Sequence, residues 1–329
     1  MRRAKRPAAS CRTTVPTHEP RAPRTDPGIA YRGRFAPSPT GPLHFGSLVA
    51  AMASYVDARH RQGAWFVRIE DVDVPRTRPG ASDAILHSLE RYGLEWDGPV
   101  WRQSSRTDAY RAALARLVAG GIAYPCACTR RELSAQPIGP LGERVYPGTC
   151  RNDIANDAAR RRRVAMRVRV PAVPVAFTDS VFGTITQRLA ADVGDFVVLR
   201  SDGYFAYQLA VVVDDAAQRI TDVVRGADLL ASTPRQIFLQ RALDVTTPRY
   251  VHVPVAVDGR GAKLSKATAA AALGPAPLPA LHAAWRFLGQ EPPPDRPSSV
   301  REWWSWAIAN WRADRVPRAF TRTVDAAGT

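Results

Sequence analysis

The pattern of apolar and polar residues near the start of the chain predicts a strand, a tight turn and an amphipathic helix. An apolar, strand-like segment enters at Arg34, and Pro and Gly residues fill the turn before His44. A turn that leads directly into a helix N-terminus presents backbone N–H groups and a positive dipole end to an anion. Gly46 lets such a ligand come close, although these residues also fit a purely structural joint. Helical spacing follows and ends before Gly63, with apolar positions at Leu48, Val49, Met52, Tyr55 and Val56.

The next segments alternate between strand and helix patterns. A mainly apolar run predicts a buried strand over Ala64–Ile69, followed by a cluster of acids that begins with Glu70. Two helices are predicted next, Ser82–Tyr92 with Ser82 as its cap and Thr107–Val118 before a pair of glycines. We therefore expect an α/β fold with a Rossmann-like, doubly wound parallel sheet, whose first half spans residues 31–121.

From about residue 122 the pattern changes. Residues 164–170 alternate between apolar and polar, which predicts a half-exposed strand in a stretch otherwise rich in turns. We expect residues 122–190 to form an insertion with its own small fold. Strand and helix patterns return at Phe196–Arg200 and Tyr207–Val213, so residues 191–275 are expected to be the second half of the α/β domain.

The last part of the chain is expected to be helical, over residues 276–329. Pro275–Pro279 is interpreted as a linker, and helices are predicted around residues 281–288 and 299–311. Ser299 and Glu302 fit a capping box at the start of the second helix. Trp303 and Trp306 share a face of that helix, which favours core packing.

Charge gives the first indication of a partner. The chain has 46 Lys and Arg against 30 Asp and Glu, a net charge of +16, which favours an acidic partner such as nucleic acid. A general abundance of arginine is the alternative. Residues 1–30 carry seven basic and two acidic residues, a net +5, which leaves 16 − 5 = +11 for the rest. We expect this basic tail to be disordered, or an over-extended start of the reading frame; an RNA-contacting arm is a further alternative.

Composition also argues against two classes of protein. No run of 18 apolar residues exists, which argues against a transmembrane protein. The N-terminal charges are not followed by an apolar stretch, which argues against a secretory signal. A cytoplasmic protein without a membrane partner is therefore expected.

Three of the four cysteines lie close together in a turn-rich stretch. Cys126, Cys128 and Cys150 fit a metal site better than disulfides, and three unligated buried thiols are the alternative. Structural zinc takes four ligands, usually Cys or His. No histidine lies between Cys128 and Cys150, so another residue type must supply the fourth ligand.

Two short segments more than 200 residues apart carry a family resemblance. His44-Phe-Gly-Ser47 and Lys263-Leu-Ser-Lys-Ala267 resemble the two signature sequences of class I aminoacyl-tRNA synthetases. Ser47 replaces the second histidine of the first signature, and Leu264 and Ala267 depart from the second. The chain is most similar to the glutamyl branch, and within it to the short glutamyl-queuosine tRNA(Asp) synthetases. Five segments carry this closer similarity: Arg34-Phe-Ala-Pro-Ser-Pro39, Val67-Arg-Ile-Glu-Asp71, Phe205-Ala-Tyr-Gln-Leu209, Val213-Asp-Asp215 and Val224-Arg-Gly-Ala-Asp228.

The resemblance implies activation of L-glutamate with ATP to glutamyl-adenylate, with Mg²⁺ bound through the phosphates. Glutamate offers two carboxylates and one ammonium, so its pocket needs cationic donors and an acid. The implied glutamate-binding residues are Arg34, Phe35, Ala36, Pro37, Ser38, Glu70, Tyr207 and Arg225. The implied ATP-binding residues are His44, Gly46, Ser47 and Lys266, and the catalytic ones are His44, Lys263 and Lys266. One structural Zn²⁺ is implied on Cys126, Cys128, Tyr146 and Cys150.

The resemblance also bears on the acceptor of the glutamate. Only 329 − 266 = 63 residues follow Lys266, too few for the anticodon-binding domain of an ordinary glutamyl-tRNA synthetase. The resemblance therefore implies transfer of glutamate to the queuosine base in the anticodon stem-loop of tRNA(Asp). A monomer is expected. The alternatives are a minimal glutamyl-tRNA synthetase, a catalytically inactive RNA-binding paralogue and a nucleotidyltransferase of the wider superfamily.

Overall fold

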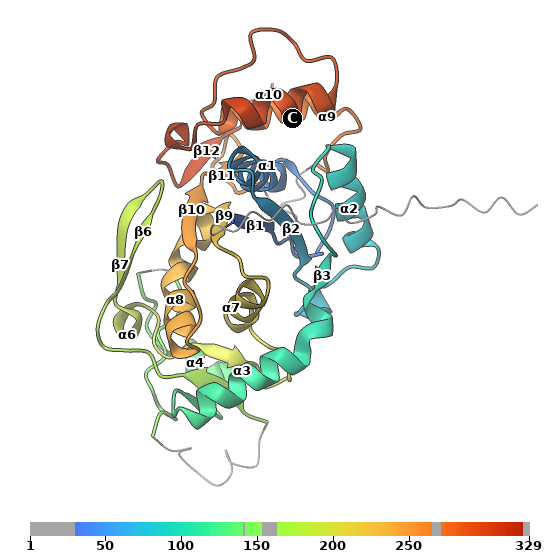
Figure 1. Ribbon diagram of the computed structural model, residues 1–329. Helices are drawn as coiled ribbons and strands as arrows, with labels where there is room; N and C mark the ends of the chain where they lie inside the picture. The colour runs from blue at the N-terminus through green and yellow to red at the C-terminus, as the bar shows by residue number, and fades with distance from the viewer. Residues whose placement is uncertain (1–29, 141, 153–162, 265–270, 325–329) are drawn as a thin grey trace, which may run out of the picture.

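The computed structural model describes residues 30–140, 142–152, 163–264 and 271–324 (Figure 1). Residues 1–29 of the expected tail lie outside the described residues, as do Lys266 and Ala267 of the second signature. No helix in the described ranges is long and apolar enough to cross a membrane.

A parallel sheet forms the centre of the molecule. The strands β1 (Arg32–Phe35), β2 (Ala64–Ile69) and β3 (Trp101–Arg102) pair in parallel, as do β9 (Asp222–Gly226) and β10 (Arg249–Val253). A backbone hydrogen bond of 3.0 Å from Thr221 N–H to Arg32 O joins the two groups beside β1. The order β3-β2-β1-β9-β10 reverses at β1, and ligands of such sheets bind at this reversal, beyond the carboxyl ends of the strands. The expected α/β fold with a parallel sheet is confirmed.

Helices cover both faces of this sheet (Figure 1). Trp65 and Val67 of β2 lie in a core with α1, whereas Ala64 and Phe66 lie in a second core on the other face. The mainly apolar run of β2 follows from this two-sided burial. The helices of the domain are α1 (Phe45–His60), α2 (Ala81–Arg91), α3 (Thr107–Ala119), α7 (Tyr207–Ala217) and α8 (Thr233–Ala242), with 3₁₀ turns at Val74–Arg76, Gln103–Arg106 and Ala227–Ser232.

The start of α2 differs from the sequence prediction. Gly80, not Ser82, is its N-cap, and no side chain caps the helix there. Gly80 has a φ of 72°, a conformation that glycine adopts readily, and it turns the chain into the helix before Ser82 is reached. The predicted cap at Ser82 was therefore wrong, although the helix itself was predicted correctly.

The segment expected to be an insertion divides between two sheets. The strands β4 (Ala123–Cys126), β5 (Ala165–Val168) and β8 (Val197–Leu199) form a small antiparallel sheet, accompanied by the short helices α4 (Arg130–Ser134) and α6 (Leu189–Asp192). The hairpin β6 (Val175–Asp179) and β7 (Gly183–Gln187) instead extends the main sheet, because Asp179 of β6 pairs in parallel with Tyr250 of β10.

Two helices of the C-terminal part pack over α1. These are α9 (Pro277–Phe287) and α10 (Val300–Asn310), followed by a 3₁₀ turn at Ala313–Arg315 and by β12 (Thr321–Thr323), which pairs with β11 (Val255–Val257). Trp285 packs edge-on against Trp303 and Trp306, and Trp304 packs edge-on against Tyr55 of α1. The predicted core role of Trp303 and Trp306 is confirmed.

Two local predictions in this part were wrong. Pro277 and Pro279 are not in a linker but in the first turn of α9, where proline costs no hydrogen bond. Ser299 Oγ accepts from Glu302 N–H as expected, but the Glu302 carboxylate accepts from Ser298 N–H and Oγ–H instead of Ser299 N–H. The reciprocal half of the capping box is therefore shifted by one residue.

Candidate active site and metal centre

A cavity of about 770 Å³ opens beyond the carboxyl ends of β1, β2 and β9. It brings together segments that lie far apart in the sequence, from β1 to the second signature. Every residue predicted to bind glutamate or ATP that the structure describes lines this cavity, as does Lys263. The residues are Arg34, Phe35, Ala36, Pro37, Ser38, His44, Gly46, Ser47, Glu70, Tyr207, Arg225 and Lys263.

Buried charges lie on the β1 and β2 side of the cavity. Arg34 is 3% exposed and its Nε lies 3.2 Å from an oxygen of Asp215. Arg68, wholly buried on β2, lies 2.8 Å from the same Asp215 oxygen and 3.3 Å from Glu70. Burial would raise the pKa of Asp215, but the two guanidinium groups of Arg34 and Arg68 hold it below its usual value. Asp215 therefore stays ionised and fixes Arg34 at the cavity wall.

The carboxyl of Glu70 has a raised pKa, unlike that of Asp215. Glu70 follows the last residue of β2, and its backbone N–H donates to Pro37 O over 3.0 Å, which fixes this end of the strand against the turn. Burial raises the pKa of Glu70 to about 6, against the attraction of Arg68 and Arg34. The carboxylate is thus ionised near neutral pH and can pair with an ammonium group.

Arg225 of β9 supplies a second buried cation. Four of its five N–H groups donate to neutral acceptors: Nε to His252 Nε2 at 3.1 Å, and the terminal nitrogens to Tyr207 Oη, Leu229 O and Thr233 Oγ1. No carboxylate among the described residues forms a salt bridge with it. Its charge is therefore available to an anionic ligand in the cavity.

The N-terminus of α1 forms the other end of the cavity. His44 is the N-cap, and its Nδ1 accepts from Ser47 N–H over 3.3 Å. The neutral ring then carries its proton on Nε2, which donates to Ser47 Oγ at 3.1 Å. Ser47, which stands where the family signature has a second histidine, thus fixes the orientation of the first one.

Leu264 of the second signature and residues 272–273 farther along the chain both lie at this helix end. A Cβ added to Gly46 would lie 3.2 Å from the His44 ring and 3.3 Å from Leu264 O, so a side chain there would push these groups back by a few tenths of an ångström. Leu273 N–H donates to Leu43 O over 2.9 Å, and Ala272 pairs with His44. Lys263 forms an ion pair with Asp228. The residues on either side of the undescribed segment 265–270 therefore lie beside His44.

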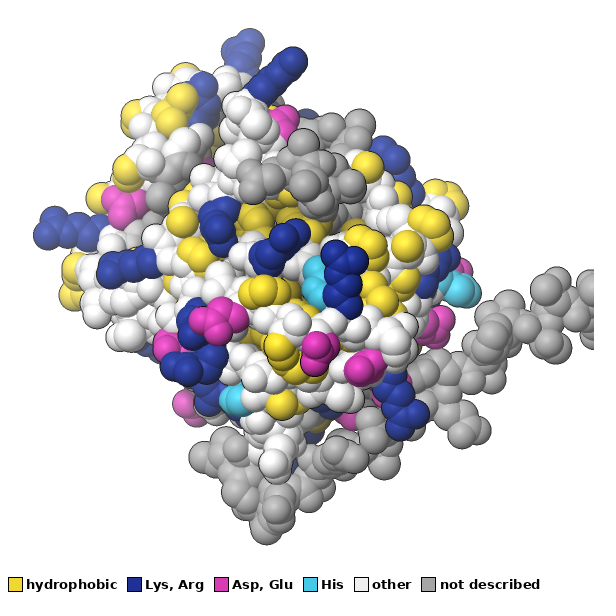
Figure 2. All heavy atoms as spheres, turned by 90° about the horizontal axis from the view of Figure 1, so that it is seen from above, with side chains coloured by type: hydrophobic (Ala, Val, Ile, Leu, Met, Phe, Trp, Pro, Cys, Tyr) yellow, Lys and Arg dark blue, Asp and Glu magenta, His cyan; other side chains and the backbone are white. Residues whose placement is uncertain are grey.

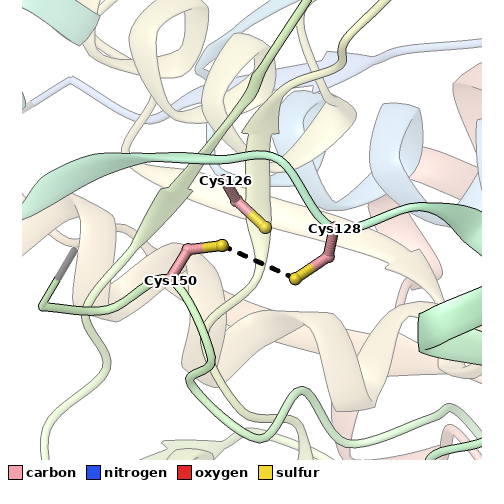
Figure 3. A group of neighbouring side chains, drawn as sticks. All are labelled: Cys126, Cys128 and Cys150. Carbon is pink, nitrogen blue, oxygen red and sulfur yellow. Dashed lines mark hydrogen bonds between the residues drawn. The ribbon is translucent and has the colours of Figure 1, made fainter. Parts of the chain in front are cut away.

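Three thiols and one phenol meet at the edge of the small antiparallel sheet, and Figure 3 shows the three cysteines. The Cys126, Cys128 and Cys150 sulfur atoms all lie within 4.8 Å of one another. Tyr146 Oη lies 3.4 Å from Cys126 Sγ and 3.6 Å from Cys128 Sγ, which itself is 3.6 Å from Cys150 Sγ. Metal–sulfur distances near 2.3 Å in a tetrahedron put neighbouring sulfurs about 3.8 Å apart, so the donor set fits a tetrahedral metal ion.

The residues around the four donors hold them in place. Gly194, with a φ of 72°, pairs with Tyr146, and a Cβ there would lie 2.5 Å from Tyr146 O. The Arg167 guanidinium lies over the Tyr146 ring and its Nε donates to Cys126 Sγ over 3.3 Å. This cluster therefore has a fixed geometry and could hold a metal.

Three residues to which the sequence analysis gave no role contact residues of the cavity wall. Arg68 and Asp215 fix Arg34 and Glu70, and His252 contacts Arg225. Arg68 carried a signal, because a charged residue between Val67 and Ile69 interrupts a run of buried apolar residues. The pairing of His252 with Arg225 carried none, because it depends on the register between β9 and β10, which places the two residues opposite each other.

The chain is similar in sequence to known class I tRNA synthetases. The family model described as "tRNA synthetases class I (E and Q), catalytic domain" matches residues 30–273. A protein of Aromatoleum aromaticum named glutamyl-Q tRNA(Asp) synthetase is 56% identical over 296 residues, which cover 89% of this chain and 92% of that relative. A protein of the same name from Pseudomonas aeruginosa is 51% identical over 300 residues, 89% of this chain and 97% of its own length.

Solved structures give the same result. The glutamate-tRNA synthetase of Elizabethkingia anophelis superposes with a TM-score of 0.75 at 25% identity, covering 90% of this chain and 68% of that one. A glutamate tRNA ligase of Elizabethkingia meningosepticum, crystallised in complex with its amino acid, superposes with a TM-score of 0.73, covering 90% and 67%. The chain therefore belongs to the class I tRNA synthetases for glutamate and glutamine, and within them to the glutamyl-Q tRNA(Asp) synthetase family.

Proposed function

We propose that this enzyme activates L-glutamate with ATP to glutamyl-adenylate and transfers the glutamate to the queuosine base in the anticodon loop of tRNA(Asp). One observation carries the activation step. Two buried guanidinium groups, on Arg34 and Arg225, and the carboxylate of Glu70 line one cavity that ends at the N-terminus of α1. This charge pattern complements an amino acid with two carboxylates and one ammonium lying beside a polyphosphate.

Each residue then has a defined role in the proposal. Arg34 and Arg225 bind the carboxylates, Glu70 pairs with the α-ammonium, and Ser38 and Tyr207 add polar contacts. His44 and the backbone around Gly46 and Ser47 face the triphosphate of ATP, whose Mg²⁺ neutralises part of the phosphate charge. The α-carboxylate attacks the α-phosphate and pyrophosphate leaves, so no general base is needed because the nucleophile is already ionised. Catalysis then rests on positioning and on stabilisation of the phosphoryl charge. We assign that stabilisation to Lys266 and Lys263.

The pKa of Glu70 makes a pH dependence testable. Below a pH of about 6 this carboxyl is protonated and loses its attraction for the α-ammonium of glutamate. We expect kcat/KM for glutamate to be constant above this pH and to fall as the pH is lowered through it, because kcat/KM reports groups of the free enzyme. Profiles of ATP–pyrophosphate exchange measured between pH 5 and 8 test this. Persistence of the acid limb in Glu70→Gln would assign it to another group.

Transfer to tRNA is supported by the relatives and by charge. The curated relatives that match most of the chain carry the name glutamyl-Q tRNA(Asp) synthetase. The net charge of +16 suits a polyanion. On the face seen in Figure 2, Lys and Arg side chains project at many places. A single-stranded anticodon loop exposes bases and phosphates that a basic pocket can bind.

Glutamate-dependent ATP–pyrophosphate exchange, run with and without tRNA, tests the proposal. We expect exchange without tRNA, and labelled glutamate on tRNA(Asp) that contains queuosine but not on tRNA(Asp) that contains guanine at that position. Label at the 3′ end of glutamate tRNA would favour a minimal glutamyl-tRNA synthetase. Absence of any glutamate-dependent exchange would refute the proposed activity.

For the thiol cluster we propose a structural Zn²⁺ held by Cys126, Cys128, Tyr146 and Cys150, which makes residues 122–190 a zinc-containing insertion. Three thiolates and a phenolate suit zinc, and a fourth protein ligand leaves no position for water. When bound, the ion would cross-link the strand β4 to the loop that carries Tyr146 and Cys150.

The metal content of the purified protein tests this assignment. Protein prepared without chelators is expected to contain about one zinc per chain, and Cys150→Ser to lose most of it, because a closed site depends on every ligand. Cys11→Ser, which changes the one cysteine outside the cluster, is the matched control and should keep its zinc. Wild-type protein without zinc would contradict the assignment.

A further inference from the structure

The hydrogen-bond partners of Arg225 include one that belongs to a buried chain of polar groups. Arg225 Nε donates to His252 Nε2 over 3.1 Å, and His252 Nδ1 lies 2.7 Å from Asp179 Oδ2. His252 is 0% exposed and Asp179 1% exposed. Neither residue lines the cavity, so neither is positioned to touch a substrate there. Burying these polar groups costs desolvation free energy, so we expect the hydrogen-bonded groups to serve a function.

The direction of these hydrogen bonds fixes the protonation of His252. A carboxylate can only accept, so the short contact with Asp179 places a proton on Nδ1. Arg225 can only donate, so Nε2 must carry a lone pair. Burial, and to a lesser degree the charge of Arg225, lowers the pKa of His252 to about 4 in spite of Asp179. The ring is therefore neutral and presents one acceptor to Arg225.

Asp179 is itself firmly held. One of its oxygens accepts from Val181 N–H and Phe182 N–H, each over 2.9 Å, and the other accepts from His252 N–H as well as from the ring. These bonds keep the carboxylate ionised, with its pKa below the usual value although burial opposes this. Asp179 is the last residue of β6. The hairpin within residues 122–190 is therefore linked to Arg225 through Asp179 and His252.

We propose that His252 and Asp179 are positioning residues that hold Arg225 in the orientation that binds a carboxylate of glutamate. Asp179 selects the tautomer of His252, and His252 Nε2 then fixes the plane of the guanidinium through its Nε. Thr233 Oγ1, 2.7 Å from a terminal nitrogen of Arg225, completes the support. A neutral acceptor is suited to this task, because a carboxylate in its place would neutralise the charge that the substrate needs. The inference rests on the proposed glutamate activation.

Three variants test the role of the Asp179–His252–Arg225 hydrogen bonds in ATP–pyrophosphate exchange. His252→Leu removes the acceptor and is expected to raise KM for glutamate by about 10- to 100-fold, the range for losing a buried hydrogen bond to a charged group. KM for ATP should stay within about twofold. Asp179→Asn should also raise KM for glutamate although the His252 ring remains. The asparagine amide can donate to His252 Nδ1, which moves the ring proton to Nε2 and removes the acceptor for Arg225. His252→Gln, whose amide oxygen can replace Nε2, should recover most of the affinity.

Tyr250→Phe is the matched control. It lies two residues from His252 on the same strand, and it removes the buried hydrogen bond from Gln240 to Tyr250 Oη, at 2.9 Å. The variant keeps the aromatic ring, which lies 5.4 Å from the Arg225 guanidinium and stacks on His252, so only the hydroxyl is lost. Its KM for glutamate should equal that of the wild type. A folded His252→Leu with unchanged KM for glutamate would overturn the inference. The inference would also be overturned if KM for glutamate and KM for ATP changed equally in all variants, Tyr250→Phe included, in proportion to their loss of thermal stability.

A measurement on the wild-type protein does not depend on whether the variants fold. Nitrogen-15 NMR of labelled histidine should show His252 as the neutral Nδ1–H tautomer between pH 6 and 8. The Nε2–H tautomer or a charged ring would overturn the inference. Wild-type protein that lacks glutamate-dependent exchange altogether would instead refute the proposed function, and the role of Arg225 with it.

Discussion

Replacing Lys266 with alanine is expected to slow glutamyl-adenylate formation by about 10²- to 10³-fold, the effect of losing one group that stabilises transition-state charge. Negative charge builds on the α-phosphate during in-line attack, and an ammonium fixed beside it acts mainly in the transition state. Lys266 lies outside the described residues, but Leu264 lies against Gly46 and Ala272 pairs with His44. Described residues before and after positions 265–270 therefore lie at the predicted phosphate site.

Single-turnover formation of glutamyl-adenylate is the appropriate measurement, with the far-ultraviolet circular dichroism spectrum as evidence that the variant folds. Arg260→Ala removes an exposed cation three residues before Lys263, outside the cavity, and should change the rate by no more than about twofold. A Lys266→Ala enzyme with a rate close to that of the wild type would contradict the assignment of Lys266.

Arg68→Met is expected to lower the free energy of unfolding by about 3–5 kcal/mol, the usual cost of removing one member of a buried ion pair. Arg68 is 0% exposed and contacts both Asp215 and Glu70. Without it the carboxylates of Asp215 and Glu70 keep Arg34 as their nearest cation, with Arg225 acting more weakly on Asp215. The pKa of Glu70 should rise further above about 6, because Arg68 is the strongest of the charges that lower it.

Two measurements check this prediction. Urea denaturation gives the free energy of unfolding, and the pH profile of kcat/KM for glutamate should show the acid limb moved to higher pH. Arg111→Met breaks an exposed ion pair with Asp108, whose members are 68% and 95% exposed, and serves as the control with no measurable change. Unchanged stability of Arg68→Met would mean that Arg68 does not compensate the two carboxylates.

Caps and linkers show where local sequence was not sufficient. Ser82 has the chemistry of a helix cap, yet Gly80 starts α2, because a turn with positive φ can place the chain in the helix without a side-chain acceptor. Pro277 and Pro279 suggested a break but lie in the first turn of α9, where the missing N–H groups have no helical partner anyway. Such choices depend on where the neighbouring element directs the chain.

The sequence by itself determined the elements and the types of chemical group in the site. The mainly apolar run Ala64–Ile69 became β2 with the predicted bounds, because a strand buried on both faces carries apolar residues at most positions. The helix predicted from Thr107 is α3, and the turn before His44 leads into α1 as expected. The family segments contained Arg34, Glu70 and Arg225, which line one cavity together.

Only the tertiary structure decided how those groups are held. Asp215 lies 181 residues from Arg34, and Asp179 lies 73 residues from His252, so no local pattern could reveal either pair. The parallel registers of β6, β9 and β10 bring Asp179, His252 and Arg225 into one chain of hydrogen bonds. The physical reason is that a side chain's charge follows from its residue type, whereas its orientation, tautomer and pKa are set by the groups that the fold buries beside it.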